Sequence, residues 1–384
     1  MIQLKHFSSI FQILTKKKNS LYVLLLFLFT SSCNASYLNN DFRDDNNTTH
    51  STGILDLQSD KLPLNIFKDK WEEMPLHNKN NNIINKVYLD IYYNLTDFKL
   101  GVFKEINKNI TINDGGVETW FYAEKDFTTL LDKEDIGTNI STSDIKGNFN
   151  YYDAYGVFLQ KIIPFNKYNF LSVKLKLYNA NDMQYIDASG YNNSDRFQLS
   201  FDYYYSNRNY ISKNNDSDNE YSGYGYGMDV EYIYNNDNLY LYTGLFNIHS
   251  FIYWRGITHM HYDFDSQTIY LGEDGYNHYK QFGSGYYKFD INYKQKIPFY
   301  SKATIDYSIK DDISLGHNFQ AFNRIYCNEP YITYALASKK FKLGYSIESQ
   351  NINFGLYLKY ISIEVSNNLS MDENVIGAKY HIKY

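Results

Sequence analysis

Apolar and polar side chains alternate with a period of two over much of the chain from residue 85 onward. The clearest runs are seven to nine residues long and lie at 87–95, 171–177, 197–205, 287–293, 303–309 and 341–347. Successive side chains of a strand point to opposite faces, so each run has one apolar and one polar face. No comparable stretch keeps the 3.6-residue period of an amphipathic helix. The pattern therefore predicts an all-β domain.

The connections between these runs differ in length. Short turns occur at 164–167, 235–238, 298–301 and 338–340, whereas long polar connections occur at 212–225 and 132–147. Short turns at one end of the strands and long loops at the other are typical of outer-membrane barrels. About 300 residues, at ~9–11 residues per tilted strand plus loops, predict a transmembrane antiparallel up-and-down β-barrel of about 12–14 strands.

A soluble β-sandwich or a secreted β-solenoid also has alternating strands and is the alternative fold. The runs are longer than the five or six residues usual in soluble strands, and Tyr and Phe gather near their ends, as at the edges of a bilayer. Their polar faces are charged, as a hydrated lumen allows. The candidate lumen residues carry both signs: Lys174, Lys176, Asp202, Asp229, Glu231, Lys288, Asp290 and Asp306.

The N-terminus has the pattern of an export signal. Lysines at 16–18 precede the apolar stretch 21–29, which is too short to span a bilayer as a helix, and small residues follow it. We expect a signal peptide at 1–33, a polar flexible leader at 34–84 and the barrel at 85–384. Two small residues directly before Cys33 resemble a bacterial lipoprotein box, so Cys33 is a possible lipidation site; ordinary cleavage nearby is the alternative.

The amino-acid composition and net charge limit the fold classes and the binding partners to be considered. Its 384 residues are 18% aromatic, with 42 Tyr, and the formal net charge is -6. These figures exclude a coiled coil, a collagen-like polymer and a charged disordered chain. Without a net basic charge, we expect no nucleic-acid partner, and no pattern in the sequence indicates a cofactor.

The last ten residues carry the most specific signal. Apolar residues alternate with polar ones and include Tyr380, Ile382 and the terminal Tyr384. This segment resembles the terminal strand of bacterial outer-membrane proteins, which the barrel assembly machinery recognises. The resemblance implies that machinery and outer-membrane lipids as partners. A strand that ends at the C-terminus is also able to pair with the first strand, which removes both sheet edges.

A second resemblance concerns residues 223–256, GYGYGMDVEYIYNNDNLYLYTGLFNIHSFIYWRG. This segment resembles part of the conjugal-transfer TraF-like and fatty-acid-transporter-like barrels. The resemblance rests on a Gly-rich start, a strand, an Asn-Asp turn and a second strand that ends in an aromatic residue, a Trp and a basic residue. The resemblance implies about 14 strands. It transfers no binding residue to this chain.

Two groups of residues are candidates for chemistry. His259, His261, Asp263 and Asp265 occupy every second position and share one strand face, and imidazole and carboxylate are ligands for a Zn-type ion. A polar strand face turned to water is the alternative. His249 and Ser250 are adjacent, so on a regular strand they point to opposite faces and form no catalytic dyad. We therefore expect no enzyme.

Two functions fit these features. The first is a porin-like channel or transporter for small solutes in the outer membrane. The second is a non-conducting surface or assembly barrel, of an adhesion or conjugation type, whose lumen is plugged by tyrosine side chains. An outer-membrane lipid hydrolase is a third, weaker possibility. The channel is preferred because it is the commonest function of such barrels, which is an analogy of fold.

Overall fold

The computed structural model describes residues 48–59, 81–95, 97–117, 143–192, 196–207, 222–266, 269–271, 277–279, 283–322, 325–336, 339–347, 351–358, 361–368 and 374–383. Apart from one short helical turn at 114–117, the regular structure is antiparallel β-sheet. The first nine strands are β1 (Thr48–Ser59), β2 (Asn81–Asn94), β3 (Phe98–Ile112), β4 (Ser143–Pro164), β5 (Asn169–Asn192), β6 (Phe197–Tyr205), β7 (Gly223–Asn235), β8 (Leu239–Asp265) and β9 (Ile269–Leu271). The others are β10 (Asn277–Tyr279), β11 (Gly283–Lys296), β12 (Tyr300–Lys310), β13 (Ile313–Phe322), β14 (Ile325–Leu336), β15 (Lys339–Ser346), β16 (Asn351–Tyr357), β17 (Ile361–Asn368) and β18 (Asn374–Lys383).

Sixteen of these strands form one sheet that closes on itself. The first and last strands pair, with Gly53 opposite Tyr380 and Ser51 opposite Ile382. On the other side of the ring, β5 pairs with β7, β7 with β8 and β8 with β12. Without β6 and β11, fourteen of the described strands complete the ring. The expected antiparallel barrel of 12–14 strands is confirmed, and so is its closure through the last strand.

The expected boundary of the barrel at residue 85 is wrong. Strand β1 lies inside the segment assigned to the flexible leader, and β2 begins at Asn81. The sequence of β1, TTHSTGILDLQS, is polar in its first half and has no long apolar alternation. It forms a strand because β2 and β18 both supply backbone partners, a tertiary effect that local pattern does not reveal. The segment 1–33, Cys33 and Tyr384 lie outside the described residues, so the signal peptide and lipidation remain predictions.

The two ends of the barrel differ in their connections. His50 and Lys383 are paired neighbours, so the first and last strands reach the same end, which we call the terminal end. Turns at 165–168, 236–238 and 311–312 lie at that end. The longest connections, 60–80 and 113–142, start from the opposite, distal end, where β13 and β14 are also joined by a two-residue connection. In outer-membrane barrels the short turns face the periplasm.

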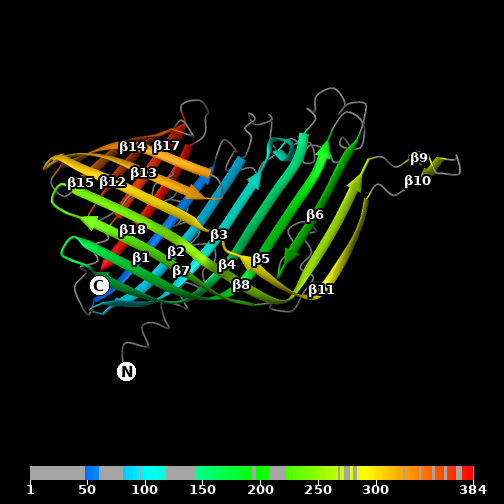
Figure 1. Cartoon of the computed structure of the whole chain (residues 1–384), viewed down its shortest axis with the longest axis horizontal. Helices are drawn as coiled ribbons and strands as arrows, with labels where there is room; N and C mark the ends of the chain where they lie inside the picture. The colour runs from blue at the N-terminus through cyan, green and yellow to red at the C-terminus, as the bar shows by residue number, and fades with distance from the viewer. Residues whose placement is uncertain are drawn as a thin grey trace, which may run out of the picture.

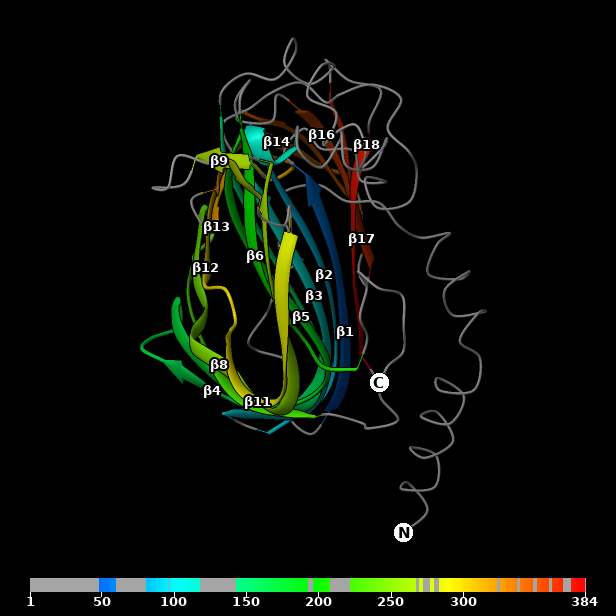
Figure 2. The ribbon, with the colours of Figure 1, turned by 90° about the vertical axis from the view of Figure 1, so that its right-hand side faces the viewer.

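One side of the wall continues far beyond the ring (Figures 1 and 2). The part of β5 nearer the terminal end pairs with β7 and its distal part with β6. Strand β8 likewise pairs with β12 near the terminal end and with β11 distally. We call β6, β11 and the distal parts of β5 and β8 the extension. With 24 and 27 residues, β5 and β8 are more than twice the ~9–11 residues that cross a bilayer, so the extension projects beyond it.

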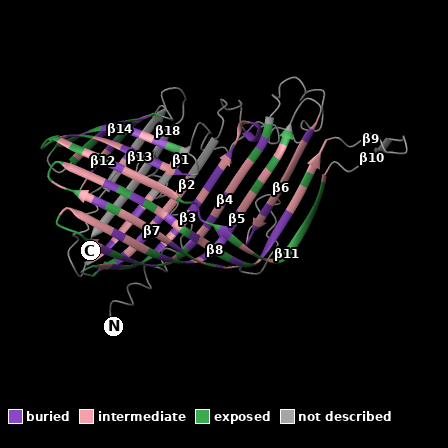
Figure 3. Ribbon diagram, viewed as in Figure 1, coloured by how far each residue is buried: buried purple, intermediate pink, exposed green. Residues whose placement is uncertain are grey.

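Burial along the strands is inverted relative to a soluble protein (Figure 3). On β5, Leu175 and Leu177 are 53% and 60% exposed, whereas Lys176 between them is 3% exposed. Glu105 on β3 and Glu329 on β14 are fully buried. Apolar side chains therefore face outward and charged ones face the lumen, which is stable only if the outer face contacts lipid. This pattern excludes the soluble sandwich.

The outer face of β7 shows where the bilayer lies. Tyr232 is exposed near the terminal end, Val230 and Met228 follow, and Tyr226 and Tyr224 are exposed near the distal end. An aliphatic band between two tyrosine girdles is the usual lipid-facing surface of a membrane barrel. The distal girdle continues on β4 and β8 at Tyr155 and Tyr253. Within the described residues, no helix is long and apolar enough to cross a membrane.

Candidate functional site

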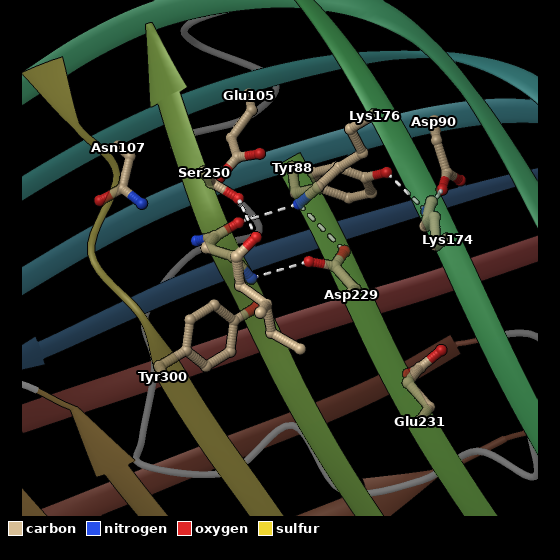
Figure 4. A network of polar contacts seen from close by, with 12 residues as sticks. Tyr88, Asp90, Glu105, Asn107, Lys174, Lys176, Asp229, Glu231, Ser250 and Tyr300 are labelled. Carbon is tan, nitrogen blue, oxygen red and sulfur yellow. Dashed lines mark hydrogen bonds and ion pairs between the residues drawn. The ribbon is translucent and has the colours of Figure 1, made fainter. Parts of the chain in front are cut away.

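The lumen holds a cavity of about 170 Å³ between β1–β5, β7, β8, β12 and β13. Figure 4 shows side chains from several of these strands converging on it. Its charged lining is five lysines and three carboxylates: Lys86, Lys99, Lys174, Lys176, Lys302, Asp90, Asp229 and Glu231. Strand alternation explains this lining, because each of these side chains has at least one apolar neighbour in sequence, and sequence neighbours on a strand point to the opposite face. We call this set the lumen cluster.

A three-strand polar link lies at the centre of the lumen cluster. Lys176 Nζ lies 3.0 Å from Asp229 Oδ2 and donates to Asn247 Oδ1 at 2.9 Å. The Asn247 backbone N–H donates to Asp229 Oδ1 at 2.9 Å. Asn247 has a φ of 59°, in the left-handed region that Asn tolerates better than most residues. The distortion of β8 at this point turns a backbone donor toward the lumen and joins β5, β7 and β8.

Two further ion pairs extend the lumen cluster. Lys174 Nζ donates to the Tyr88 hydroxyl at 2.8 Å and lies 3.4 Å from Asp90 Oδ2. Lys86 Nζ lies 3.3 Å from Glu105 Oε1, which also accepts a hydrogen bond from Tyr152 at 2.8 Å. Asp90, Glu105 and Asp229 thus each have a lysine and a second donor, which for Asp90 is the Thr52 hydroxyl, as buried charges require.

An apolar and aromatic layer lies beside the lumen cluster on the distal side. It consists of inward-facing residues of β2–β5 and β8 with Ile297, and includes Phe103, Tyr152, Phe158, Tyr178 and Trp254. Phe103 and Tyr178 meet edge to face with ring centroids 5.2 Å apart, and Lys174 Nζ lies 3.8 Å from the centroid of Phe158. The lumen therefore offers an aromatic surface next to a charged one.

A second buried network lines the opposite wall. Glu329 accepts hydrogen bonds from Lys342, Asn318 and Asn353, each at 2.8 Å. Lys342 also lies 3.7 Å from Glu364. A cavity of about 190 Å³ at the terminal end lies beside this network and is lined by Asp306, Tyr331 and Lys340 among others.

Most lumen residues expected from the sequence do face the lumen. Lys174, Lys176, Asp229, Glu231 and Asp306 line the two cavities. Asp202 and Lys288 lie instead on the extension, opposite the histidines of β8, and Asp290 is an exposed residue of β11. Sequence reasoning missed Lys86 and Glu105. Lys86 directly precedes the polar run that holds Tyr88 and Asp90, whereas Glu105 lies in a weakly alternating segment and had no such signal.

The four candidate metal ligands lie on the extension. His259 Nε2 is 2.7 Å and His261 Nδ1 3.0 Å from the same oxygen of Asp202, a residue of β6. His261 Nε2 lies 3.0 Å from Asp263. Asp265 binds Arg196 and not the histidines: Arg196 Nε and Nη2 donate hydrogen bonds to its two carboxylate oxygens at 3.1 and 2.7 Å. The expected shared face is thus present, but within the described residues no three His, Cys, Asp or Glu side chains are placed to hold a metal ion.

The position of His261 dictates its protonation. Both ring nitrogens face carboxylate oxygens, and a neutral imidazole has only one N–H to donate. Partial burial lowers the pKa of His261, but hydrogen bonds to Asp202 and Asp263 outweigh it and raise the pKa above its usual value. Two carboxylates that face the two ring nitrogens stabilise the protonated imidazole, and the metal site stays a prediction.

The adjacent pair His249 and Ser250 forms no dyad. His249 is exposed and Ser250 is buried, so the two side chains point to opposite sides of the wall. His249 has a φ of 48° next to a register shift between β7 and β8, but this distortion does not bring the two side chains to one face.

No protein-family model matches the chain, and no curated relative matches it. Among solved structures, it is similar to a deletion mutant of the TodX monoaromatic hydrocarbon channel, with 10% identity, a TM-score of 0.42 and coverage of 88% of this chain and 89% of that chain. The P. putida toluene transporter TodX follows with 9% identity, a TM-score of 0.40 and 89% of each chain. A Pseudomonas aeruginosa FadL homologue has 9% identity, a TM-score of 0.35 and coverage of 88% and 86%.

The outer-membrane protease OmpT of Escherichia coli is also similar, with 7% identity, a TM-score of 0.22 and coverage of 88% and 94%. At these identities and TM-scores the similarity concerns the fold alone. The expected antiparallel β-barrel is confirmed by its own strand pairing, which closes the sheet.

Proposed function

We propose that this protein is a narrow outer-membrane channel for small solutes that combine an aromatic or apolar body with an anionic group. The observation that carries the proposal is the lumen cluster beside the aromatic layer. Its lining has an excess of two positive charges, five lysines against three carboxylates. A lumen with mixed charges and a positive excess favours anions weakly over cations.

The two halves of the lumen have different tasks in this proposal. The aromatic layer with Phe158 and Trp254 contacts the apolar part of the solute by stacking. The ammonium groups of Lys174 and Lys176 attract the anionic part, and their carboxylate partners keep that attraction weak enough for release. A channel needs such moderate binding, because a solute that binds too tightly does not leave.

The second candidate is a plugged barrel with a role in surface assembly. Tyr152 and Trp254 are almost fully buried inside the ring, and the two lumen cavities described above have volumes of about 190 and 170 Å³. In a plugged barrel, the ion pairs of the lumen cluster join neighbouring strands of the barrel wall, and no solute passes through the lumen.

Planar-bilayer conductance distinguishes the two. We expect the refolded barrel to conduct in small steady steps and to show a zero-current potential of the anion-selective sign across a KCl gradient. The double variant K86Q/K174Q should shift that potential toward cation selectivity, whereas K146Q, on the exposed distal part of β4, should leave it unchanged. A protein that folds, as judged by heat-modifiable migration on a gel, and does not conduct would overturn the channel and support the plugged barrel.

A further inference from the structure

We propose that Arg255 and Lys294 form a site on the outer face of the barrel for the phosphomonoester group of a membrane glycolipid. Both residues lie where β8 and β11 pair, at the level of the distal tyrosine girdle. The site is separate from the lumen and does not depend on the channel proposal.

Both cations face outward. Trp254 and Gln295 are buried and turned inward, where they share a hydrogen bond of 2.9 Å, and their sequence neighbours Arg255 and Lys294 are exposed. Lys294 lies directly opposite Tyr253, one of the girdle residues. Arg255 is two positions further along the same face of β8, on the distal side. The ring of Tyr253 therefore marks the edge of the hydrocarbon, and Arg255 lies at the level of the lipid phosphates.

The aromatic surroundings prepare the position of Lys294. Its Nζ lies 3.8 Å from the ring centroid of Phe251 and 5.3 Å from that of Tyr253. Tyr226 packs against both rings, with centroids 6.3 and 6.5 Å away. The aliphatic stem of Lys294 thus lies along an apolar surface while its ammonium group reaches the interface. Cation–ring contacts leave the three N–H donors able to bind an anion.

Within the part of the chain that the structure describes, no carboxylate is paired with Arg255. Among the described residues, none forms an ion pair or hydrogen bond with the Arg255 side chain. Asp290, the acidic residue of β11, is four positions from Lys294, which is roughly 13 Å along a strand. Lys104 is bound to Asp153 on the outer faces of β3 and β4. Lys296, two positions from Lys294 on β11, is a further exposed cation beside the site.

The charges of Arg255 and Lys294 favour a phosphate group as the ligand. An exposed charge on the lipid-facing surface is tolerated near the interface and is costly within the hydrocarbon. A guanidinium fork binds phosphate through two parallel hydrogen bonds, and a nearby ammonium adds a point charge. A phosphomonoester carries nearly two negative charges, so it matches two cations better than a singly charged phosphodiester does. The distal leaflet position agrees with a phosphorylated glycolipid.

Native mass spectrometry of the full, refolded chain in detergent tests the site with three probes: diphosphoryl lipid A, phosphatidylglycerol and phosphatidylcholine. We expect lipid A to be retained and the other two to be lost. The variants R255Q and K294Q should each weaken lipid A retention about fivefold, and R255Q/K294Q should weaken it further. The matched control is K161Q, because Lys161 is also exposed, with its Nζ 5.3 Å from the Phe98 ring, but at the terminal end.

Folding is checked by heat-modifiable gel migration, and the single variants carry the test if the double variant does not fold. Retention of lipid A by R255Q and K294Q at the level of the parent protein would overturn the site. Equal retention of lipid A and phosphatidylglycerol would overturn its preference for a phosphomonoester. An equal loss in K161Q would show a nonspecific charge effect and would also overturn it.

Discussion

Replacing Lys176 by Met should destabilise the barrel through a single buried ion pair. Lys176 and Asp229 are 3.0 Å apart, with side chains 3% and 9% exposed. Removing one partner of such a pair typically costs about 3–5 kcal/mol, because the other charge stays buried without compensation. Asp229 keeps the backbone N–H of Asn247 as a donor at 2.9 Å, which places the expected loss near the lower end, about 3 kcal/mol.

The double variant K176M/D229N distinguishes this reasoning from simple loss of packing. With both charges absent, no uncompensated charge remains, and replacing a buried pair by neutral groups is often nearly neutral. We therefore expect K176M/D229N to be more stable than K176M alone. The free energy of unfolding is measured by urea titration in detergent, with the fluorescence of the lumen residue Trp254 contributing to the signal. If the two single effects simply add in the double variant, the pair is not coupled and the argument fails.

The matched control is K146M on the distal part of β4. Lys146 lies 3.6 Å from Asp144, but the two side chains are 71% and 68% exposed. Water screens this pair, so its loss should leave the unfolding midpoint unchanged within error. A comparable loss in K146M would mean that lysine deletion itself, rather than burial of the charge, causes the effect.

Three other predictions concern the extension and the wall. The imidazolium of His261 should stabilise the extension at low pH and lose this effect as the pH rises through its raised pKa. Its partners Asp202 and Asp263, whose pKa values are lowered, should keep their contribution until the pH falls below those values. Protection of β6 amides, corrected for the intrinsic exchange rate at each pH, should therefore be highest near about pH 5–6, and a flat protection profile, or one unchanged in H261Q, would contradict this. G156V should prevent folding, since a Cβ at Gly156 would lie 1.9 Å from the Leu177 carbonyl oxygen, whereas G147A, with its nearest neighbour 3.8 Å away, should fold normally on the same gel assay. Treatment with EDTA should leave the melting temperature unchanged, because the histidine cluster binds a proton; a drop in the parent protein that is absent in H259Q/H261Q would reinstate a metal site.

The sequence predicted the barrel because a lipid-facing strand must alternate. Leu175, Lys176 and Leu177 show the rule. A side chain of such a strand faces either the lipid or the lumen, so the alternation of apolar and polar residues along the sequence predicts which of the two it faces. The same rule placed Lys174 and Asp229 in the lumen correctly. It failed for β1, whose polar residues become a strand through pairing with two neighbours. It also failed to anticipate Asn247, because the distortion that turns its N–H toward Asp229 depends on how β7 and β8 shift in register.

The candidate metal site shows the limit of arguments from a single strand. Alternation placed His259, His261 and Asp263 on one face, as found, but the partner that decides their chemistry, Asp202, comes from another strand. Because β6 pairs with the distal part of β8, one carboxylate reaches both imidazoles and competes with any metal. Spacing within a strand gives a row of ligands, whereas convergence on one point requires neighbouring strands to contribute. The order of the strands in the sheet, which the spacing of residues within one strand does not specify, therefore determines which side chains surround the two histidines.

The unequal length of the wall connects these sites. If every strand were as short as β15 or β16, the ring would end near the tyrosine girdle and no strand would continue beyond the bilayer. Because β5 and β8 continue, each has a second partner strand, and the junctions between first and second partners distort the wall. Asn247 and Arg255 lie in β8 between its pairing with β12 near the terminal end and its pairing with β6 distally. Because β8 has successive partner strands, it places Asn247, a hydrogen-bond donor in the lumen, and Arg255, a cation on the outer face, only eight positions apart in the sequence.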